Sequence, residues 1–155
     1  MNVGIKRLKP AAIIPDYQTN GAAAFDFHAC LDEPYTIAAG DRAIVTTGLA
    51  FEIPDGYEMQ VRARSGLSIR HGITMVNGVG TIDSDYRGEL GVLVINLGQE
   101  PFVVEPGMRI AQGLVAKVER VTWEERDSLS ETARGAGGFG STGTASTAST
   151  SVKNV

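Results

Sequence analysis

The chain has 155 residues, the length of one ordinary domain, and 43% of them are hydrophobic, which is enough to bury a core. Its net charge is −4 and no apolar run approaches the roughly 20 residues of a membrane span, so we expect neither nucleic acid nor a membrane as a partner. The N-terminal residues resemble no signal peptide and Cys30 is the single cysteine, which favours a reducing, cytoplasmic compartment.

Segments rich in Val, Ile and Thr, separated by turn formers, predict a series of short β-strands. Residues 44–53 predict one strand, ended by a turn at Pro54-Asp55-Gly56. Residues 57–64 alternate apolar and polar side chains, as a half-buried strand does, and residues 91–97 and 110–121 predict two more strands. Turn formers recur every ~8–12 residues, the spacing of a sandwich or barrel. The sequence therefore predicts an all-β domain.

Helix is scarce in this sequence. Residues 66–71 predict a single helical turn, with Ser65 placed to cap it. We expect the β core to span residues 1–126, with the charged stretch 118–126 bent or frayed, and an arm to follow over residues 127–143. Residues 144–155 consist largely of Ser, Thr and Ala, which bury little apolar surface, and predict a disordered tail.

The first polar cluster is Arg64-Ser65-Gly66-Leu67-Ser68. A cation, a hydroxyl and a glycine at the start of a helical turn would direct backbone N–H groups and positive charge toward one point, which suits phosphate. A helix cap beside a surface arginine explains the same residues equally well. The cluster alone leaves both interpretations open.

The second polar cluster covers residues 77–89 and reads Asn-Gly-Val-Gly-Thr-Ile-Asp-Ser-Asp-Tyr-Arg-Gly-Glu. Gly78 and Gly80 would let a ligand approach the backbone closely, and a carboxylate between two apolar strands could act as a general base. A polar hairpin is the alternative, but hairpin loops need only two to five residues, far fewer than this stretch contains.

The third polar cluster covers residues 134–143 and reads Arg-Gly-Ala-Gly-Gly-Phe-Gly-Ser-Thr-Gly. It is no P-loop, because no lysine precedes Ser141 and no strand–loop–helix unit surrounds it. A mobile arm that becomes ordered on a phosphate explains it better. The alternative is a flexible linker, which would have little use for the aromatic Phe139 and the cation Arg134.

Five motifs in order resemble those of the trimeric dUTP diphosphatase (dUTPase) family, over residues 6–143. They cover residues 22–27, 64–68, 77–89, 106–112 and 134–143. The resemblance implies a distorted jelly-roll of the dUTPase-like β-clip type, a homotrimer with a flexible C-terminal arm, and active sites shared between subunits. It also implies hydrolysis of dUTP to dUMP and pyrophosphate, which lowers dUTP and supplies the precursor of dTMP.

The resemblance also assigns the chemistry. Asp83 would be the general base that activates water for in-line attack on the α-phosphorus, and Arg134 would stabilise the developing charge as an arginine finger. Mg²⁺ would bridge the substrate's phosphates. The family pattern implies no direct protein ligand for this metal, with Asp26 at most an outer-sphere partner.

Substrate binding would be divided among three of the motifs and the arm. A backbone hairpin with an asparagine amide would select uracil, a tyrosine would lie under the deoxyribose, and arm residues would cover the base and the terminal phosphate. The resemblance assigns four roles to residues of this chain. They are uracil binding by Gly80, Thr81, Ile82 and Asn77, deoxyribose contact by Tyr86, phosphate binding by Arg64, Ser65, Gly66 and Gln112, and arm contacts by Phe139, Gly140, Ser141 and Thr142.

Three positions depart from the family pattern without removing a chemical group: Ala24 replaces a glycine, Ala63 replaces a proline, and Gly78-Val79 replaces a frequent small residue followed by proline. We therefore expect activity to be kept. Two rival functions stay open. A dCTP deaminase, which shares the fold, would release ammonia, and a non-catalytic nucleotide-gated regulatory trimer would be expected to lack Asp83 or an intact arm.

Overall fold

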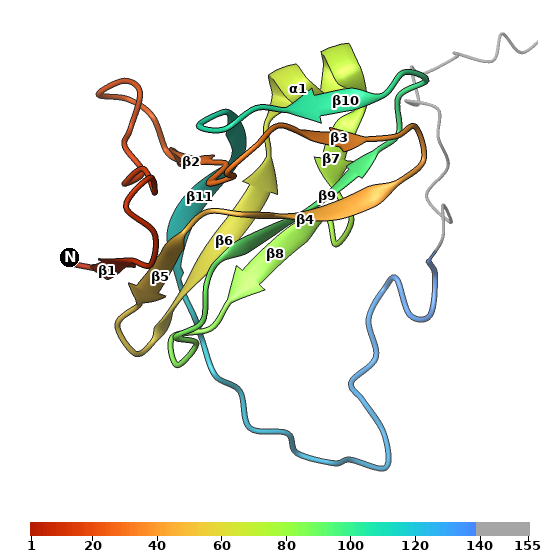
Figure 1. The fold of residues 1–155 in the computed structure, drawn as a ribbon. Coiled ribbons are helices and arrows are strands. Elements are labelled where there is room, and N and C mark those ends of the chain that lie inside the picture. Colours follow the sequence, from red (N-terminus) through yellow and green to blue (C-terminus); the bar gives the residue numbers. More distant parts are fainter. Residues whose placement is uncertain (139–155) are drawn as a thin grey trace, which may run out of the picture. The chain divides into compact units, whose positions relative to one another are not determined.

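The computed structural model describes residues 1–138, and the expected all-β architecture is confirmed there (Figure 1). A compact unit spans Met1–Arg120, and a second unit begins at Val121 and contains neither helix nor strand through residue 138. In chain order the elements are β1 Gly4–Arg7, β2 Phe25–His28, β3 Tyr35–Ile37, β4 Arg42–Thr46, β5 Leu49–Glu52, β6 Tyr57–Ala63, α1 Ser65–His71, β7 Ile73–Met75, β8 Val79–Ile82, β9 Gly91–Asn96, β10 Phe102–Val104 and β11 Arg109–Lys117.

The strands form four antiparallel sheets within the described residues (Figure 1). Two are pairs, β1-β5 and β10-β3, one has the order β4-β9-β7, and the largest has the order β2-β11-β6-β8. In the largest sheet, β8 pairs with β6 alone, from Met59↔Ile82 to Arg62↔Val79. The outer edge of β8 therefore meets no other strand in the described part of the chain. Among those residues no helix has the length and apolar character needed to cross a membrane.

The alternating pattern of residues 57–64 places one face of β6 in the core, as predicted. Met59 and Val61 are almost fully buried, whereas Arg62 is exposed. Beside β6, the buried Gly113 of β11 lies where an added Cβ would overlap the rings of Phe25 and Phe27. Only glycine fits there, so β11 can pack closely against the aromatic rings that β2 carries.

Two predicted strands have the wrong limits. Residues 44–53 form two strands, because the chain turns at Gly48, whose φ of +67° suits glycine. An added Cβ on Gly48 would also lie 2.7 Å from the Cys30 Sγ atom. The strand predicted over 110–121 begins at Arg109 and ends at Lys117, where its pairing with Tyr57 of β6 ends.

The helix lies where the sequence predicts it, but the predicted capping by Ser65 is wrong. Ser65 is the first residue of α1, and Arg64 occupies the N-cap position with an extended backbone and no side-chain cap hydrogen bond. The helix ends at Gly72, whose left-handed φ of +70° lets its N–H reach the carbonyls of Leu67 and Ser68. Arg64 therefore marks the junction between β6 and α1 and keeps its side chain available for other contacts.

Candidate active site

Asp83 directly follows β8, at the start of a tight turn. The Tyr86 N–H donates to the Asp83 carbonyl at 3.2 Å and closes this turn. The Asp83 side chain is exposed, and within residues 1–138 its carboxylate accepts no hydrogen bond and joins no ion pair. All of its lone pairs are therefore free for a water molecule or a ligand.

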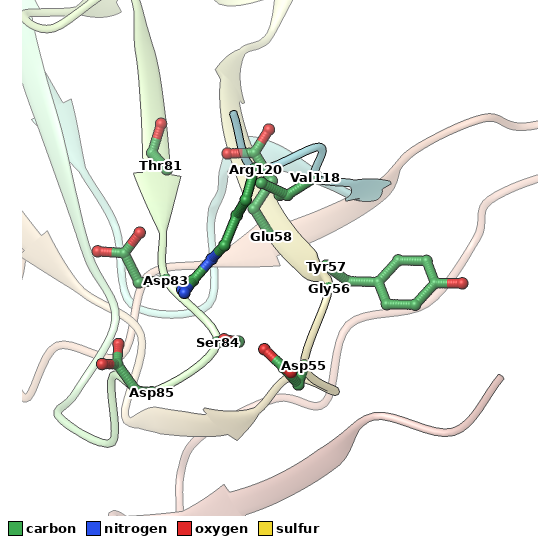
Figure 2. Close-up of a pocket in the computed structure, with 10 residues that line it drawn as sticks. All are labelled: Asp55, Gly56, Tyr57, Glu58, Thr81, Asp83, Ser84, Asp85, Val118 and Arg120. Atoms are coloured by element: carbon green, nitrogen blue, oxygen red, sulfur yellow. The ribbon is translucent and has the colours of Figure 1, made fainter. Parts of the chain in front are cut away.

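A hollow of about 390 Å³ opens beside this carboxylate (Figure 2). Of the predicted site residues, Asp83 and Thr81 line it, and the Arg120 side chain points into it toward Asp83. Three further acids, Asp55, Glu58 and Asp85, also line it. The complete lining is Asp55, Gly56, Tyr57, Glu58, Thr81, Asp83, Ser84, Asp85, Val118 and Arg120.

The predicted uracil-binding segment lies along the free edge of the large sheet. Gly78 has a φ of +68°, and its N–H donates to the Met75 carbonyl at 3.2 Å, which makes a tight turn before β8. The Asn77 Nδ2 atom lies 3.3 Å from where a Cβ on Gly80 would be. The asparagine amide and the backbone of Gly80 are thus neighbours, as the resemblance implies, and the outer edge of β8 has no strand partner.

Tyr86 is held by the turn that follows Asp83 rather than by the core. Its side chain is 46% exposed, and its hydroxyl donates to the Glu89 carbonyl at 3.0 Å. Gly88 lies directly against the phenol ring, where a Cβ would overlap the hydroxyl. The Glu89 carboxylate accepts the N–H of Gly48 at 2.8 Å, and this bond fastens the turn to the β4–β5 bend. Tyr86 therefore has an exposed ring on a firmly anchored loop.

A charged cluster lies at the junction of β2, β6 and β11. Asp26 is only 2% exposed, and its Oδ1 atom lies 3.4 Å from the Arg64 Nε atom. Its Oδ2 atom lies 3.1 Å from the Arg109 Nη1 atom, which also donates to the Gln18 Oε1 atom at 3.0 Å. Arg64 also donates from Nη1 to the Arg109 carbonyl at 2.9 Å. One buried carboxylate thus holds two guanidinium groups.

His28 lies next to this cluster at the end of β2, where it pairs with Arg109. Burial lowers the pKa of His28 below its usual value of 6.5, and the positive charges of Arg109 and Arg64 act in the same direction, against the opposing effect of Asp26. The Nδ1 atom of His28 is buried without a hydrogen-bond partner in the described structure. The His28 imidazole therefore loses its proton more readily than a free imidazole does.

The other predicted phosphate contacts lie near this cluster. Gln112 is half-buried on β11, directly opposite Asp26 on one side and Arg62 on the other. Ser65 and Gly66 are exposed in the first turn of α1, next to Arg64. The four residues predicted to bind phosphate thus share one end of the sheet.

Within one chain, the predicted base and the predicted phosphate contacts lie far apart. Asp83 follows Ile82, which pairs with Met59, so Asp83 lies near the Glu58 end of β6. Arg64 lies beyond the other end. Arg64 lies six residue steps after Glu58, which is about 20 Å at the usual rise of a β-strand. One chain therefore does not bring both groups to one phosphorus atom.

In the second unit, Arg134 is exposed and folds onto its own segment. Its Nε atom donates to the Gly137 carbonyl at 2.7 Å, and the Gly137 N–H donates to the Arg134 carbonyl at 3.1 Å. Gly135 has a φ of +50°. The other predicted arm contacts and the predicted disordered tail lie outside the described residues: Phe139, Gly140, Ser141, Thr142 and residues 144–155.

The described residues offer a poor site for a directly bound metal ion. No group of three His, Cys, Asp or Glu side chains converges within residues 1–138. Asp26, the predicted outer-sphere partner, is already neutralised by Arg64 and Arg109.

Sequence reasoning missed several polar residues around these sites. Arg109 lies in the fourth motif and its contact with Asp26 was not predicted, although a lone arginine in an apolar strand is a usable signal. Glu89 ends the third motif, and its contact with Gly48 depends on a bend that was not predicted. Arg120 lies in a segment predicted to fray, so nothing in the sequence placed it beside Asp83.

Comparison with known proteins identifies the family. The sequence profile of dUTPase matches residues 11–143. The chain belongs to the dUTPase family. The deoxyuridine 5'-triphosphate nucleotidohydrolase of Rickettsia felis is 54% identical over 136 residues, which cover 87% of this chain and 92% of that protein. The same enzyme of Rickettsia conorii is 52% identical over the same shares of both chains.

Solved structures agree on the fold of this dUTPase family member. A dUTPase from Staphylococcus bacteriophage 80alpha, in complex with dUpNHpp, superposes with a TM-score of 0.84 and 23% identity, covering 92% of this chain and 99% of that one. A dUTPase from phage phi11 of S. aureus, described with a structural Mg(II) ion, gives a TM-score of 0.75 and 19% identity, with 83% and 99% covered. The expected jelly-roll-like β fold is confirmed.

Proposed function

We propose that this dUTPase hydrolyses dUTP to dUMP and pyrophosphate, with Asp83 activating the water that attacks the α-phosphorus in line. The assignment of the reaction rests on membership of the dUTPase family. The proposed mechanism rests on the exposed Asp83 carboxylate, which has no protein partner within residues 1–138 and lies beside a hollow. A cytoplasmic location belongs to the same proposal, since Cys30 is a buried free thiol.

Asp83 carries out proton transfer in this proposal. Its free lone pairs accept a hydrogen bond from water, orient one oxygen lone pair toward phosphorus, and take the proton as the P–O bond forms. The bond to the bridging oxygen breaks on the opposite side, and pyrophosphate leaves with that oxygen. Arg134 of the arm stabilises the charge that develops on the phosphates.

Base selection uses the outer edge of β8. Backbone groups of Gly80, Thr81 and Ile82 on an unpaired edge strand can bond a planar base as a neighbouring strand would. The Asn77 amide beside Gly80 adds a side-chain donor and acceptor. Cytosine would then place its amine against a donor, and the unmatched groups would weaken its binding. Tyr86 presents its exposed ring to the deoxyribose.

Phosphate binding uses the opposite end of the sheet. Arg64 supplies the charge, and Ser65, Gly66 and Gln112 supply neutral hydrogen bonds. Mg²⁺ would be held by phosphate oxygens and water, where it would neutralise charge on the leaving pyrophosphate. The cation then needs no side chain of this chain as a direct ligand, in keeping with the arginine contacts of Asp26.

A homotrimer with shared sites completes the proposal. The separation of about 20 Å along β6 between Asp83 and Arg64 supports it, because a base and a phosphate contact must meet at one triphosphate. A neighbouring subunit can bring its Arg64 end to the Asp83 end of this chain. The arm contacts assigned to Phe139, Gly140, Ser141 and Thr142 then close the site from the remaining subunit.

A nucleotide panel tests the proposed function. Purified protein is mixed with dUTP, dCTP, dTTP or UTP and excess Mg²⁺, and pyrophosphate and ammonia are both measured. We expect pyrophosphate from dUTP far in excess of the other nucleotides, and no ammonia from dCTP. Ammonia release would favour the deaminase, and absence of both products would favour the regulatory trimer.

A further inference from the structure

Arg109 was assigned no role in binding or catalysis, yet it connects the buried Asp26 carboxylate, Gln18 and Arg64. Its Nη1 atom contacts both the Asp26 Oδ2 atom at 3.1 Å and the Gln18 Oε1 atom at 3.0 Å. Its carbonyl accepts the Arg64 Nη1 atom at 2.9 Å. Arg109 therefore supports Arg64 by two routes, one through its backbone and one through Asp26.

Asp26 is suited to transmit this support. Its side chain is 3% exposed, and the pairing of β2 with β11 places it opposite Gln112. The Arg64 Nε atom lies 3.4 Å from its Oδ1 atom, but that oxygen accepts no hydrogen bond in the described structure. The Asp26 carboxylate lies between two cations, and only one of its two oxygens accepts a hydrogen bond. Its single negative charge can hold both guanidinium groups in place but can neutralise only one of them.

The balance of charge in the cluster favours an incoming anion. Two guanidinium groups face one carboxylate, so the cluster of Arg64, Arg109 and Asp26 carries one more positive than negative charge. Arg64 is less exposed than Arg109, with side-chain exposures of 26% and 43%. Arg64 is therefore the more buried of the two guanidinium groups, and its charge is less screened by water toward a phosphate that reaches it.

We propose that Arg109 and Asp26 form a clamp that orients the Arg64 guanidinium toward the substrate's phosphates. Both are positioning residues, because they act through Arg64. The inference rests on the proposed function, in which Arg64 contacts phosphate. The clamp assigns Asp26 a positioning role rather than that of an outer-sphere metal partner, because its carboxylate forms ion pairs with Arg64 and Arg109.

The test uses Asp26→Asn, Arg109→Gln and Arg109→Lys in the full-length protein. Dissociation constants are measured for two probes: the non-hydrolysable analogue dUpNHpp at several Mg²⁺ concentrations, and deoxyuridine, which lacks phosphate. Two exposed residues outside the cluster supply matched controls, Asp32→Asn and Arg42→Lys. Thermal unfolding of every variant is recorded.

The clamp predicts a loss confined to phosphate recognition. Asp26→Asn and Arg109→Gln should weaken dUpNHpp binding by about 10- to 100-fold, the value of one charged hydrogen bond, while deoxyuridine binds as before. Arg109→Lys should recover part of the loss, because a lysine keeps the charge but not the planar fork. Both control variants should bind dUpNHpp like the unmodified protein.

Three results would overturn the clamp. The first is unchanged dUpNHpp binding in Asp26→Asn and Arg109→Gln. The second is an equal loss for deoxyuridine and dUpNHpp, which would mean a general structural role. The third is recovery of Asp26→Asn at high Mg²⁺, which would assign Asp26 to the metal. Failure of the proposed function is separate, since the unmodified protein would then release no pyrophosphate from dUTP.

Discussion

The two ends of β6 carry polar groups in opposite states. At one end, Asp26 is buried and holds Arg64 and Arg109 through ion pairs. At the other, Asp83 is exposed and has no partner within the described residues. In the proposed mechanism the Arg64 end binds the phosphates, and such a group benefits from being held in place in advance. The proposed general base, Asp83, needs free lone pairs to bind and deprotonate a water molecule, and its carboxylate has them within the described residues.

The largest expected effect comes from removing the free carboxylate. Asp83→Asn should lower kcat by about 100- to 10,000-fold, the usual contribution of a general base, while dUpNHpp binding stays within a few fold. Single-turnover rates and analogue affinity measure the two quantities. Asp41→Asn, an exposed change before β4, is the control. A variant with near-normal kcat would disprove the base assignment.

Removing the arm should produce the next largest effect. A chain that ends before Arg134 should lose about 100- to 1,000-fold in kcat if, as proposed, the arm stabilises charge in the transition state. Its oligomeric state, measured by light scattering, should not change. Removal of residues 144–155 alone is the matched control and should have little effect. Full activity in the shorter chain would remove the arm from the mechanism.

A smaller effect should follow from releasing the loop at the Asp83 end. Glu89→Ala leaves the Gly48 N–H without its acceptor, and should cost about 1–3 kcal/mol of unfolding free energy. Urea unfolding gives this value. Glu52→Ala is the control, since Glu52 is exposed and lies 4.0 Å from Arg87, so its loss should change stability by less than about 1 kcal/mol. Equal losses of unfolding free energy in the two variants would show that the Glu89 contact with Gly48 stabilises the protein no more than an exposed ion pair does.

The smallest effect concerns the charge at the Arg64 end. Because the pKa of His28 is lowered in the folded protein, the unfolded chain binds a proton more readily. This contribution to stability is complete above pH 6.5 and is lost as the pH falls through the folded value. Unfolding free energies from pH 5 to 8 should therefore decline less on acidification in His28→Gln. Parallel curves for both proteins would contradict a lowered pKa.

Local patterns predicted the parts of the fold that depend on neighbouring residues. The alternation over residues 57–64 located β6 and its buried face, because the period of two is a property of a single strand. The single strand predicted over 44–53 was wrong, because the bend at Gly48 is fixed by Cys30 and Leu90, which lie far away in the sequence. Strand propensity alone does not contain such contacts.

The same distinction applies to the site. Motifs within one segment, such as residues 77–89, identified Asp83 and Tyr86 as candidates, since their spacing is local. The cluster of Asp26, Arg64 and Arg109 joins three segments whose proximity exists only through the pairing of β2 with β11 and of β11 with β6. Nothing in the spacing of these residues along the chain indicates that pairing.

The tight packing of Cys30 against Gly48 gives this protein a built-in chemical reporter. The chain has one sulfhydryl, it is buried, and it sits behind the bend that the Glu89 carboxylate holds. A thiol reagent can reach Cys30 only when that region opens, so the rate of alkylation reports how often this part of the protein opens. Mass spectrometry of the labelled protein could therefore follow transient opening of this bend during turnover, without any engineered probe.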